Sequence, residues 1–443
     1  MKLNALERIR VAFVTLGCAK NEVDTSRMRD KVIAAGMELT DSIEEAEVVV
    51  VNTCSFIQEA TEESLEAIFE LSDLDAVKSG KTRLIVAGCM PSRYGKDLEG
   101  ELKEATAFLP CDKEESIVQV IEDLLGIEVS ATKPFDQAVQ INLNDEKSRE
   151  LSPSVYVKIS EGCDRYCSYC TIPFIRGRYR SYPLDEIEGD VQSKIVRGAR
   201  EIVLIAQDTG RWGKDLPGEL DLAHLLKTLA AKHPDTWFRM MYLQPEGVSE
   251  ALLEVVATFP NICKYLDIPF QHSNTEILSL MNRTGSSKEY KALITHIREC
   301  IPSITLRTTM IAGFPGETEK AFEELCAFIE ECDFDYVGVF PYSQEEGTKA
   351  AELPGQIDEP TKLNRAQRIR DLADALSISK ISAKVDTELD VLILGKDEEG
   401  QLFGRAQCQA PDVDGVVFLE TGKIGDIISL IVEDTFLYDM EGK

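Results

Sequence analysis

Short apolar runs alternate with helical stretches along most of the chain, and this alternation limits its fold more than any other feature. Near the start the runs cover 11–18, 46–54 and 82–89, and helical patterns at 24–36 and 60–74 separate them. Buried strands that alternate with helices form βαβ units, in which the strands run parallel. The pattern therefore predicts an α/β multidomain protein whose N-terminal domain is a parallel α/β sheet.

Each of these three runs ends in a cysteine: Cys18, Cys54 or Cys89. Because ligands of open parallel sheets bind beyond the carboxyl ends of the strands, we expect the three sulfurs to converge on one edge. The first eighteen residues have no secretion-signal pattern, and no apolar run reaches the roughly 20 residues that span a bilayer. We therefore expect a cytoplasmic protein without membrane contact, whose twelve cysteines serve metal or redox chemistry and not disulfides.

A second α/β region follows a polar stretch that we interpret as a linker. Six strand-like runs alternate with helical patterns, as in a partial (β/α) TIM-type barrel whose active site lies at the carboxyl ends of its strands. The runs are 155–160, 201–209, 238–245, 265–272, 303–316 and 336–343. Polar residues near the predicted strand ends are Gln207, Asp208, Thr209, Gln271, His272, Arg307 and Thr308.

The chain is predicted to end in a small antiparallel β-barrel. A charged helical stretch at 359–385 leads into short strand patterns at 388–395, 402–408, 415–420 and 426–434, with turn signals between them. The predicted domains are 1–127, a linker at 128–148, 149–376 and 377–443.

Three further cysteines, Cys163, Cys167 and Cys170, lie in the run GCDRYCSYC directly after the first strand of the predicted barrel. Three thiolates on one loop can bind three irons of a 4Fe-4S cluster and leave the fourth iron open to an outside molecule. The alternative is incidental thiols or a zinc site completed elsewhere. The strand-end triad is also one thiolate short of a closed site, so the sequence predicts two open clusters. The other six cysteines are interpreted as small buried hydrophobes.

The spacing CxxxCxxC, with Tyr169 just before the third cysteine, resembles the signature of radical S-adenosylmethionine enzymes. The later run TTMIAGFPGET, which contains Gly313, resembles the glycine-containing strand of that superfamily. The resemblance implies that the loop cluster binds S-adenosylmethionine, and that the glycine strand packs along its adenine. Tyr169, Gln207, Asp208, Gln271, Arg307, Thr308 and Gly313 are the candidate cosubstrate residues, of which Arg307 could grip a carboxylate or ribose.

End to end, the chain resembles the methylthiotransferases, which have a three-cysteine domain, a radical domain and a TRAM-type barrel. The runs LIAQDTGRWGKDL, IPFQH and GRAQCQAPDVDG resemble the RimO family, which methylthiolates the β-carbon of an aspartate on small-subunit ribosomal protein twelve. The resemblance implies a radical cluster on the loop triad and an auxiliary, sulfur-supplying cluster on the strand-end triad. A radical must remove the hydrogen because no general base could usefully deprotonate that carbon.

Charge favours a basic protein as the substrate. The chain has 78 acidic and 48 basic residues, and its last 67 residues have 14 acidic and 6 basic. A barrel that binds phosphate should instead present Lys and Arg. We therefore expect Asp412 and Asp414 to dock a basic small-subunit ribosomal protein, unless these are only solvated loop charges. Nucleic acid is not expected, the chain should act as a monomer, and an electron donor protein is implied.

Two alternatives remain. The sister MiaB family acts on tRNA and typically carries an Asn-rich segment where this chain has Gln207, Asp208 and Thr209. A non-catalytic iron-sulfur carrier would have no evident use for Tyr169 or the glycine strand. His272 could transfer protons, or it could be a satisfied structural residue.

Overall fold

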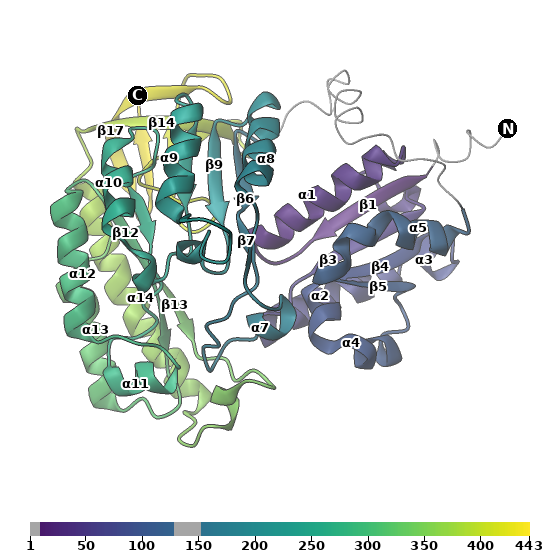
Figure 1. The fold of residues 1–443 in the computed structure, drawn as a ribbon, viewed down its shortest axis with the longest axis horizontal. Coiled ribbons are helices and arrows are strands. Elements are labelled where there is room, and N and C mark those ends of the chain that lie inside the picture. The colour runs from purple at the N-terminus through teal and green to yellow at the C-terminus, as the bar shows by residue number, and fades with distance from the viewer. Residues whose placement is uncertain (1–8, 128–151) are drawn as a thin grey trace. The chain divides into compact units, whose positions relative to one another are not determined.

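The computed structural model describes residues 9–127 and 152–443, so the predicted linker at 128–148 lies outside them. The described residues divide into two compact units, whose helices and strands are labelled in Figure 1. The first unit comprises 9–127, 162–164 and 170–179, and the second comprises 152–161, 165–169 and 180–443.

The first unit is built on a parallel sheet in the order β2-β1-β3-β4-β5, as the alternating pattern predicts. Its strands are β1 (Arg10–Thr15), β2 (Glu38–Leu39), β3 (Val48–Thr53), β4 (Arg83–Gly88) and β5 (Ala107–Pro110). Strand β3, VVVVNT, is buried at every position. A parallel sheet is covered on both faces, so its strands are apolar throughout and rich in β-branched residues.

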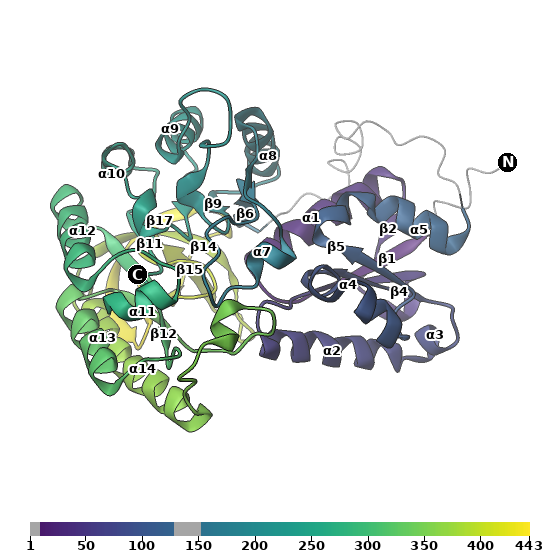
Figure 2. The same ribbon diagram turned by 60° about the horizontal axis from the view of Figure 1, so that its bottom comes forward.

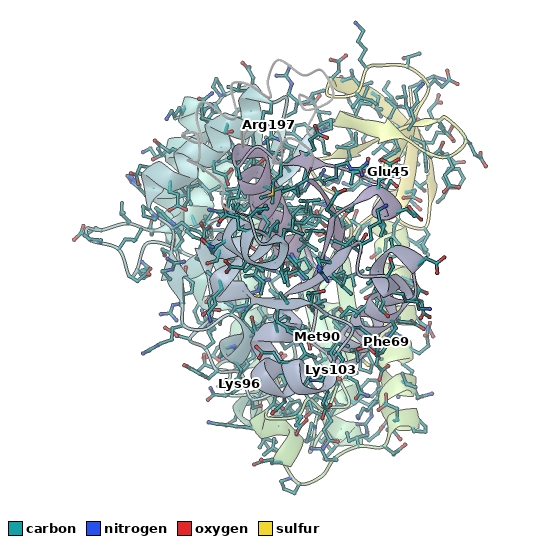
Figure 3. All side chains as sticks on the ribbon, turned by 90° about the vertical axis from the view of Figure 1, so that its right-hand side faces the viewer. Glu45, Phe69, Met90, Lys96, Lys103 and Arg197 are labelled. Atoms are coloured by element: carbon teal, nitrogen blue, oxygen red, sulfur yellow. The ribbon has the colours of Figure 1, made fainter. Side chains whose placement is uncertain are left out.

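Helices cover both faces of this sheet: α1 (Ala19–Ala34), α2 (Gln58–Ser72), α3 (Asp75–Lys78), α4 (Cys89–Glu101) and α5 (Ile117–Leu125). One core joins α1 and α5 to Val50 of β3, and the other joins α2 and α4 to Val51, because successive strand residues point to opposite faces. Figure 3 shows the side chains of this unit, including Phe69 on α2 and Lys96 on α4. The segment 170–179 adds the short helix α7 (Ile172–Ile175).

The second unit contains six parallel strands, one in each predicted run. They are β6 (Ser154–Lys158), β9 (Glu201–Ile205), β10 (Trp237–Met240), β11 (Tyr265–Asp267), β12 (Thr305–Ala312) and β13 (Tyr336–Pro341). They form two sheets, β10-β9-β6 and β11-β12-β13. A bridge between Phe238 and Ile262 joins the sheets, and the Leu243 amide donates to the Asp267 carbonyl at 2.9 Å. The strands therefore form the predicted partial barrel.

Helices lie around the outside of these strands (Figure 2). They are α8 (Leu184–Val196), α9 (Leu222–Lys232), α10 (Glu250–Thr258), α11 (Thr275–Leu280), α12 (Ser287–Cys300), α13 (Glu319–Cys332) and α14 (Glu359–Ser382). From α9 onward, each helix begins after an Asp, Ser, Asn or Thr whose side chain accepts an amide of the first turn. The predicted domain boundary at 376/377 falls inside α14. Two short strands, β7 (Ser160–Glu161) and β8 (Arg180–Ser181), flank the cysteine loop.

The chain ends in a closed barrel in the order β14-β15-β16-β18-β17. Its strands are β14 (Glu388–Lys396), β15 (Leu402–Ala406), β16 (Val417–Leu419), β17 (Ile427–Phe436) and β18 (Asp439–Gly442). The small barrel is therefore confirmed, but it has an unpredicted fifth strand, β18, which pairs parallel to β16. Its sequence, DMEG, has no apolar alternation to predict it.

Within the second unit, buried ion pairs attach this barrel to the strands of the partial barrel. Glu201, at the start of β9, accepts from Arg239 Nε at 2.9 Å and Ser154 Oγ at 2.7 Å, and it pairs with Arg405 of β15. All three charged side chains are at least 94% buried.

Among the described residues, no helix is both long and apolar enough to span a bilayer.

Candidate functional site

Cys18, Cys54 and Cys89 follow the carboxyl ends of β1, β3 and β4, which are neighbours in the sheet. Cys18 lies at the N-cap of α1 and is exposed, whereas Cys54 and Cys89 are buried. The Cys89 thiol shares a hydrogen bond with Cys54, and this bond is the main cause of a lowered pKa of Cys54. The parallel topology therefore brings these strand-end positions to one edge, as expected.

A glycine allows the backbone before Cys18 to approach Cys54 closely. Gly17 has a φ of +93°, and a Cβ built there would lie 2.5 Å from the Cβ of Cys54. Only glycine adopts this conformation readily and leaves that space free. The short turn between β1 and α1 therefore depends on Gly17.

Cys111, interpreted from the sequence as a buried hydrophobe, lies beside this triad. It follows the end of β5, the next strand in the sheet, and its thiol forms a hydrogen bond with that of Cys89. This bond and burial raise the pKa of Cys111. The signal that could have found it is the same one that found the others, a cysteine directly after a short apolar run.

Arg176, which the sequence did not single out, contacts the strand-end site. Its Nη1 donates to Asp24 at 2.7 Å, and its Nη2 lies 2.7 Å from Asn21 Oδ1 and 3.6 Å from Cys89 Sγ. The arginine and the aspartate side chains are each 2% exposed. A buried guanidinium beside these thiols favours their ionised, metal-binding form.

A second contact holds the Cys170 end of the loop in the same unit. The Thr171 hydroxyl donates to the Phe56 carbonyl at 2.9 Å. At the other end, the Cys163 amide donates to the Gly177 carbonyl at 3.1 Å. Gly162, with φ +73°, leaves room for the Arg178 carbonyl, which would lie 2.2 Å from any Cβ there.

Cys167 belongs to the second unit. Arg283 Nη1 lies 4.0 Å from its sulfur and Nη2 donates to the Pro269 carbonyl at 2.8 Å. Asn282 Nδ2 donates to the carbonyls of residues 165 and 166, and the Ser168 hydroxyl donates to that of residue 280. Polar side chains of the β11–α12 connection thus support the middle of the cysteine loop.

Tyr169 connects the cysteine loop with the glycine-containing strand by a ring contact. Its ring packs edge-on against Phe314, with centroids 6.4 Å apart, and Phe314 directly follows Gly313. Gly313 has φ +75°, and Lys362 fills the space where its side chain would be, with Cγ 2.6 Å from a built Cβ. The glycine therefore admits a lysine of α14.

Gln207 and Asp208 follow the carboxyl end of β9. Asp208 accepts from Arg165 Nε, on the cysteine loop, at 2.6 Å, and Gln207 Nε2 donates to Glu161 at 3.2 Å. Within the part of the chain that the structure describes, Gln207 Oε1 and Asp208 Oδ1 are buried without a hydrogen-bond partner. Burial raises the pKa of Asp208, although Arg165 opposes it. Two unsatisfied acceptors beside the loop are suited to a ligand with N–H or O–H donors.

Arg307 and Thr308 do not lie at the carboxyl end of a strand, so the position expected for these two candidates is wrong. Strand β12 continues to Ala312, so both residues lie near its amino end. Arg307 pairs with Asp267 at 3.1 Å, and the Thr308 hydroxyl donates to the Ile268 carbonyl at 2.8 Å. These contacts to Asp267 and Ile268 lie within the barrel wall.

Both ring nitrogens of His272 have hydrogen-bond partners. The amides of Ser273 and Asn274 donate to its Nδ1 at 2.9 and 3.0 Å, so Nε2 carries the hydrogen and donates to Glu317 at 3.2 Å. The ring is fully buried. Its neighbour Gln271 has φ +69°, and its backbone pairs with β12.

The two predicted docking acids differ. Asp412 is exposed and accepts from the Tyr156 hydroxyl. The Asp414 carboxylate is 0% exposed and accepts from the Tyr265 hydroxyl at 2.6 Å and from the Ala410 amide at 2.8 Å. The expectation that Asp414 docks a partner is therefore wrong, because the side chain points into the protein.

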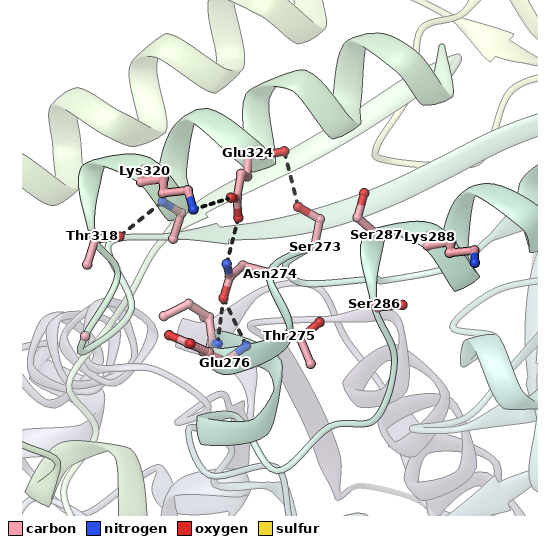
Figure 4. Close-up of a pocket in the computed structure, with 13 residues that line it drawn as sticks. Ser273, Asn274, Thr275, Glu276, Ser286, Ser287, Lys288, Thr318, Lys320 and Glu324 are labelled. Carbon is pink, nitrogen blue, oxygen red and sulfur yellow. Dashed lines mark hydrogen bonds and ion pairs between the residues drawn. The ribbon is translucent and has the colours of Figure 1, made fainter.

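Two further features lie away from the cysteine loop. Glu250, His296 and Cys300 offer ligand atoms within 4.8 Å of one another, but two of the three residues are exposed and His296 already pairs with Glu250 at 2.7 Å. A polar hollow of about 390 Å³ lies between α11, α12 and α13, and Asn274 and Lys320 in it both contact Glu324 (Figure 4). It contains none of the predicted site residues.

The residues present fit iron-sulfur clusters. Each triad offers soft thiol ligands and has an arginine near a sulfur, Arg176 at Cys89 and Arg283 at Cys167. Thiolate ligands are what 4Fe-4S clusters require, and nearby cations favour thiolates.

Three family descriptions match successive parts of the chain: "Uncharacterized protein family UPF0004" at residues 10–110, "Radical SAM superfamily" at 157–329 and "TRAM domain" at 385–443. The ribosomal protein uS12 methylthiotransferase RimO of Geobacter sulfurreducens is 40% identical over 99% of both chains. The RimO of Geotalea uraniireducens is 41% identical over 98% of both. The chain belongs to the RimO family. RimO enzymes use radical S-adenosylmethionine chemistry with two 4Fe-4S clusters.

Solved structures share the fold of this RimO family member more distantly. The radical S-adenosylmethionine methyltransferase TsrM from Kitasatospora setae, with tryptophan and a cosubstrate analogue bound, has a TM-score of 0.53 at 15% identity. The match covers 74% of this chain and 72% of that one. At this identity it supports the fold alone.

Proposed function

We propose that this chain methylthiolates the β-carbon of an aspartate on the ribosomal protein uS12. The observation that carries the proposal is the full-length identity to RimO enzymes, together with the cysteine triads that such chemistry needs. When bound, the clusters and S-adenosylmethionine supply the radical that removes the hydrogen, and the sulfur and methyl groups that replace it.

We assign the radical cluster to Cys163, Cys167 and Cys170, and the auxiliary cluster to Cys18, Cys54 and Cys89. Hydrogen bonds along the loop support the first assignment. The Cys163 amide, the Thr171 hydroxyl and the carbonyl of residue 165 each have a partner, and these bonds fix the backbone that carries the cysteines. Convergence at one sheet edge supports the second.

Arg176 and Thr171 give the assignment a physical basis. Both follow Cys170 closely in sequence, and both contact the strand-end loops of the sheet. The two contacts hold the Cys170 end of one triad against the other within the first unit. A carbon radical is short-lived, so the group that supplies sulfur must be close to where the radical forms.

Gln207 and Asp208 are the polar residues that we propose for the cosubstrate. Their unsatisfied oxygens can accept hydrogen bonds from an ammonium or hydroxyl group beside the loop. Arg165 holds Asp208 in place through the 2.6 Å contact. Tyr169 and Gly313 contribute by packing and not by polar contacts.

The acidic C-terminal barrel supports a basic protein as the substrate. The turn from Asp397 to Gly400 is largely exposed, as is Asp412. These charges would repel the phosphates of RNA and attract a basic chain. We further propose that the protein acts as a cytoplasmic monomer and receives electrons from a donor protein.

The deciding experiment offers uS12 and a tRNA anticodon stem in parallel to the enzyme, reconstituted without oxygen and supplied with iron, sulfide, reductant and S-adenosylmethionine. Mass spectrometry should find a methylthio group on an aspartate of uS12 and none on the RNA. A methylthio group on the RNA alone would refute the proposed substrate.

Two variants test the division between the triads. Cys167→Ala should abolish reductive cleavage of S-adenosylmethionine, whereas Cys54→Ala should retain cleavage and lose sulfur insertion. Cys300→Ala, an exposed cysteine outside both triads, is the matched control and should keep both activities. Equal loss of cleavage in the first two variants would contradict the assignment, and a protein that never cleaves the cosubstrate would be a carrier.

A further inference from the structure

Three cysteines form a row across adjacent strands of the first unit. In the sheet register Thr53 pairs with Gly88, and Gly88 pairs with Pro110. The residue after each of these is a cysteine: Cys54, Cys89 and Cys111. Neighbouring strands lie about 4.8 Å apart, so the row places three sulfur-bearing residues side by side at the carboxyl edge. Cys18 follows β1, the strand next to β3.

The Cys89 thiol, in the middle of this row, interacts with the thiols on either side of it. Cys89 shares hydrogen bonds with both Cys54 and Cys111. Local packing holds Cys111 in this position, since its backbone amide donates to the Ser92 hydroxyl of α4 at 2.8 Å. The edge therefore carries four cysteines in four successive strand-end loops: the strand-end triad and Cys111.

We propose that Cys111 is a fourth thiolate ligand of the auxiliary cluster site, which closes the site until the sulfur substrate arrives. The inference rests on the proposed function, because it takes Cys18, Cys54 and Cys89 as the other three ligands.

A fourth thiol at this position has a chemical purpose. A cluster held by three thiolates exposes one iron to water and is easily lost, whereas four thiolates complete the ligand set. The exchange is a simple ligand substitution: hydrosulfide binds in place of the Cys111 thiolate, which takes up the proton that hydrosulfide releases. No oxidant or reductant is needed. Arg176, 3.6 Å from Cys89 Sγ, offers a positive charge beside the row of sulfurs and favours the thiolates that bind the cluster.

The test uses the full-length chain with Cys163, Cys167 and Cys170 replaced by Ala, so that the auxiliary cluster alone gives the electron paramagnetic resonance signal. In this background we expect Cys111→Ala to change the g values of the reduced cluster. The sulfide concentration that half-converts the signal should fall at least tenfold, because sulfide no longer competes with a thiolate. Superimposable spectra and equal sulfide dependence, at equal iron content, would overturn the proposal.

Alkylation provides a second readout that does not depend on the spectrum. In otherwise wild-type, cluster-loaded protein, iodoacetamide should label Cys111 much more slowly than in the cluster-free protein, and added sulfide should restore labelling. Peptide mass spectrometry measures this against Cys326, a partly exposed cysteine outside the first unit, whose labelling should not change. Equal labelling of Cys111 with and without the cluster would also overturn the inference.

Cys54→Ala in the same background separates the two hypotheses. If it retains a full auxiliary cluster, the assignment of the three main ligands fails, and with it the proposed function of the site. If it loses the cluster while Cys111→Ala leaves spectrum and labelling unchanged, only the role of Cys111 fails.

Discussion

Replacement of Glu201 by Gln should strongly destabilise the second unit. The carboxylate lies between Arg239 and Arg405 and accepts from Ser154. Glutamine keeps the size of the side chain but removes its charge, and leaves two buried guanidinium groups without a counter-ion. Loss of one partner from a buried ion pair costs roughly 3–5 kcal/mol.

The pKa of Glu201 gives an independent magnitude. Burial alone would raise this pKa, but Arg405 and Arg239 outweigh burial and lower it from 4.5 to about 2. That difference corresponds to about 3.4 kcal/mol in favour of the ionised carboxylate. The folded pKa is depressed, so the stabilisation is fully present above about pH 4.5 and disappears as the pH falls towards 2. Both routes therefore predict a loss of about 3 kcal/mol near neutral pH.

Urea unfolding followed by tryptophan fluorescence is the assay, because the two tryptophans of the chain, Trp212 and Trp237, both lie in the second unit. With an m value of about 3 kcal/mol/M, the urea midpoint should fall by about 1 M. Glu254→Gln, at an exposed position of α10, is the matched control and should change stability by less than about 0.5 kcal/mol. If both variants unfold at the wild-type midpoint at pH 7, the reasoning about this ion-pair cluster is refuted.

Three further predictions concern Asp414 and the cysteine loop. Burial raises the pKa of Asp414 from 3.8 to about 6, so wild-type stability should fall as the pH rises from about 4 to 6, and Asp414→Asn should flatten this part of the urea-midpoint profile. Gly162→Ala should lower iron content and cosubstrate cleavage, because the new Cβ would collide with the Arg178 carbonyl. Gly177→Ala is the control: this glycine has a similar φ but open space around a Cβ, so the variant should lose less iron and less cleavage. Equal losses in the two variants would exclude the collision as the cause. Arg176→Met should lower the thermal midpoint of the first unit, measured by circular dichroism, while the exposed Arg178→Met should not.

Sequence periodicity predicted the architecture well, because burial on two faces of a parallel sheet leaves an apolar run that is easy to recognise. Each of the six strands of the partial barrel overlaps one predicted run. The errors concern strand ends and side-chain directions, which the hydrophobic pattern does not encode. Arg307 was expected at a strand end, but β12 continues to Ala312, and an apolar run does not say at which residue a strand stops. Asp414 was expected at the surface, but turn residues have no periodicity that reveals side-chain direction.

The sequence by itself determined the chemistry of this protein: six cysteines in two triads, a glycine strand and an acidic C-terminal barrel are all properties of residue type and spacing. Tertiary structure decided which groups meet. Cys111 joins the strand-end cysteines only because β5 lies next to β4, and Arg176 contacts Cys89 only because the loop after Cys170 packs on the sheet edge. Such contacts join residues far apart in the chain, and no local pattern encodes them, because only the packing of whole elements fixes which strand ends are neighbours.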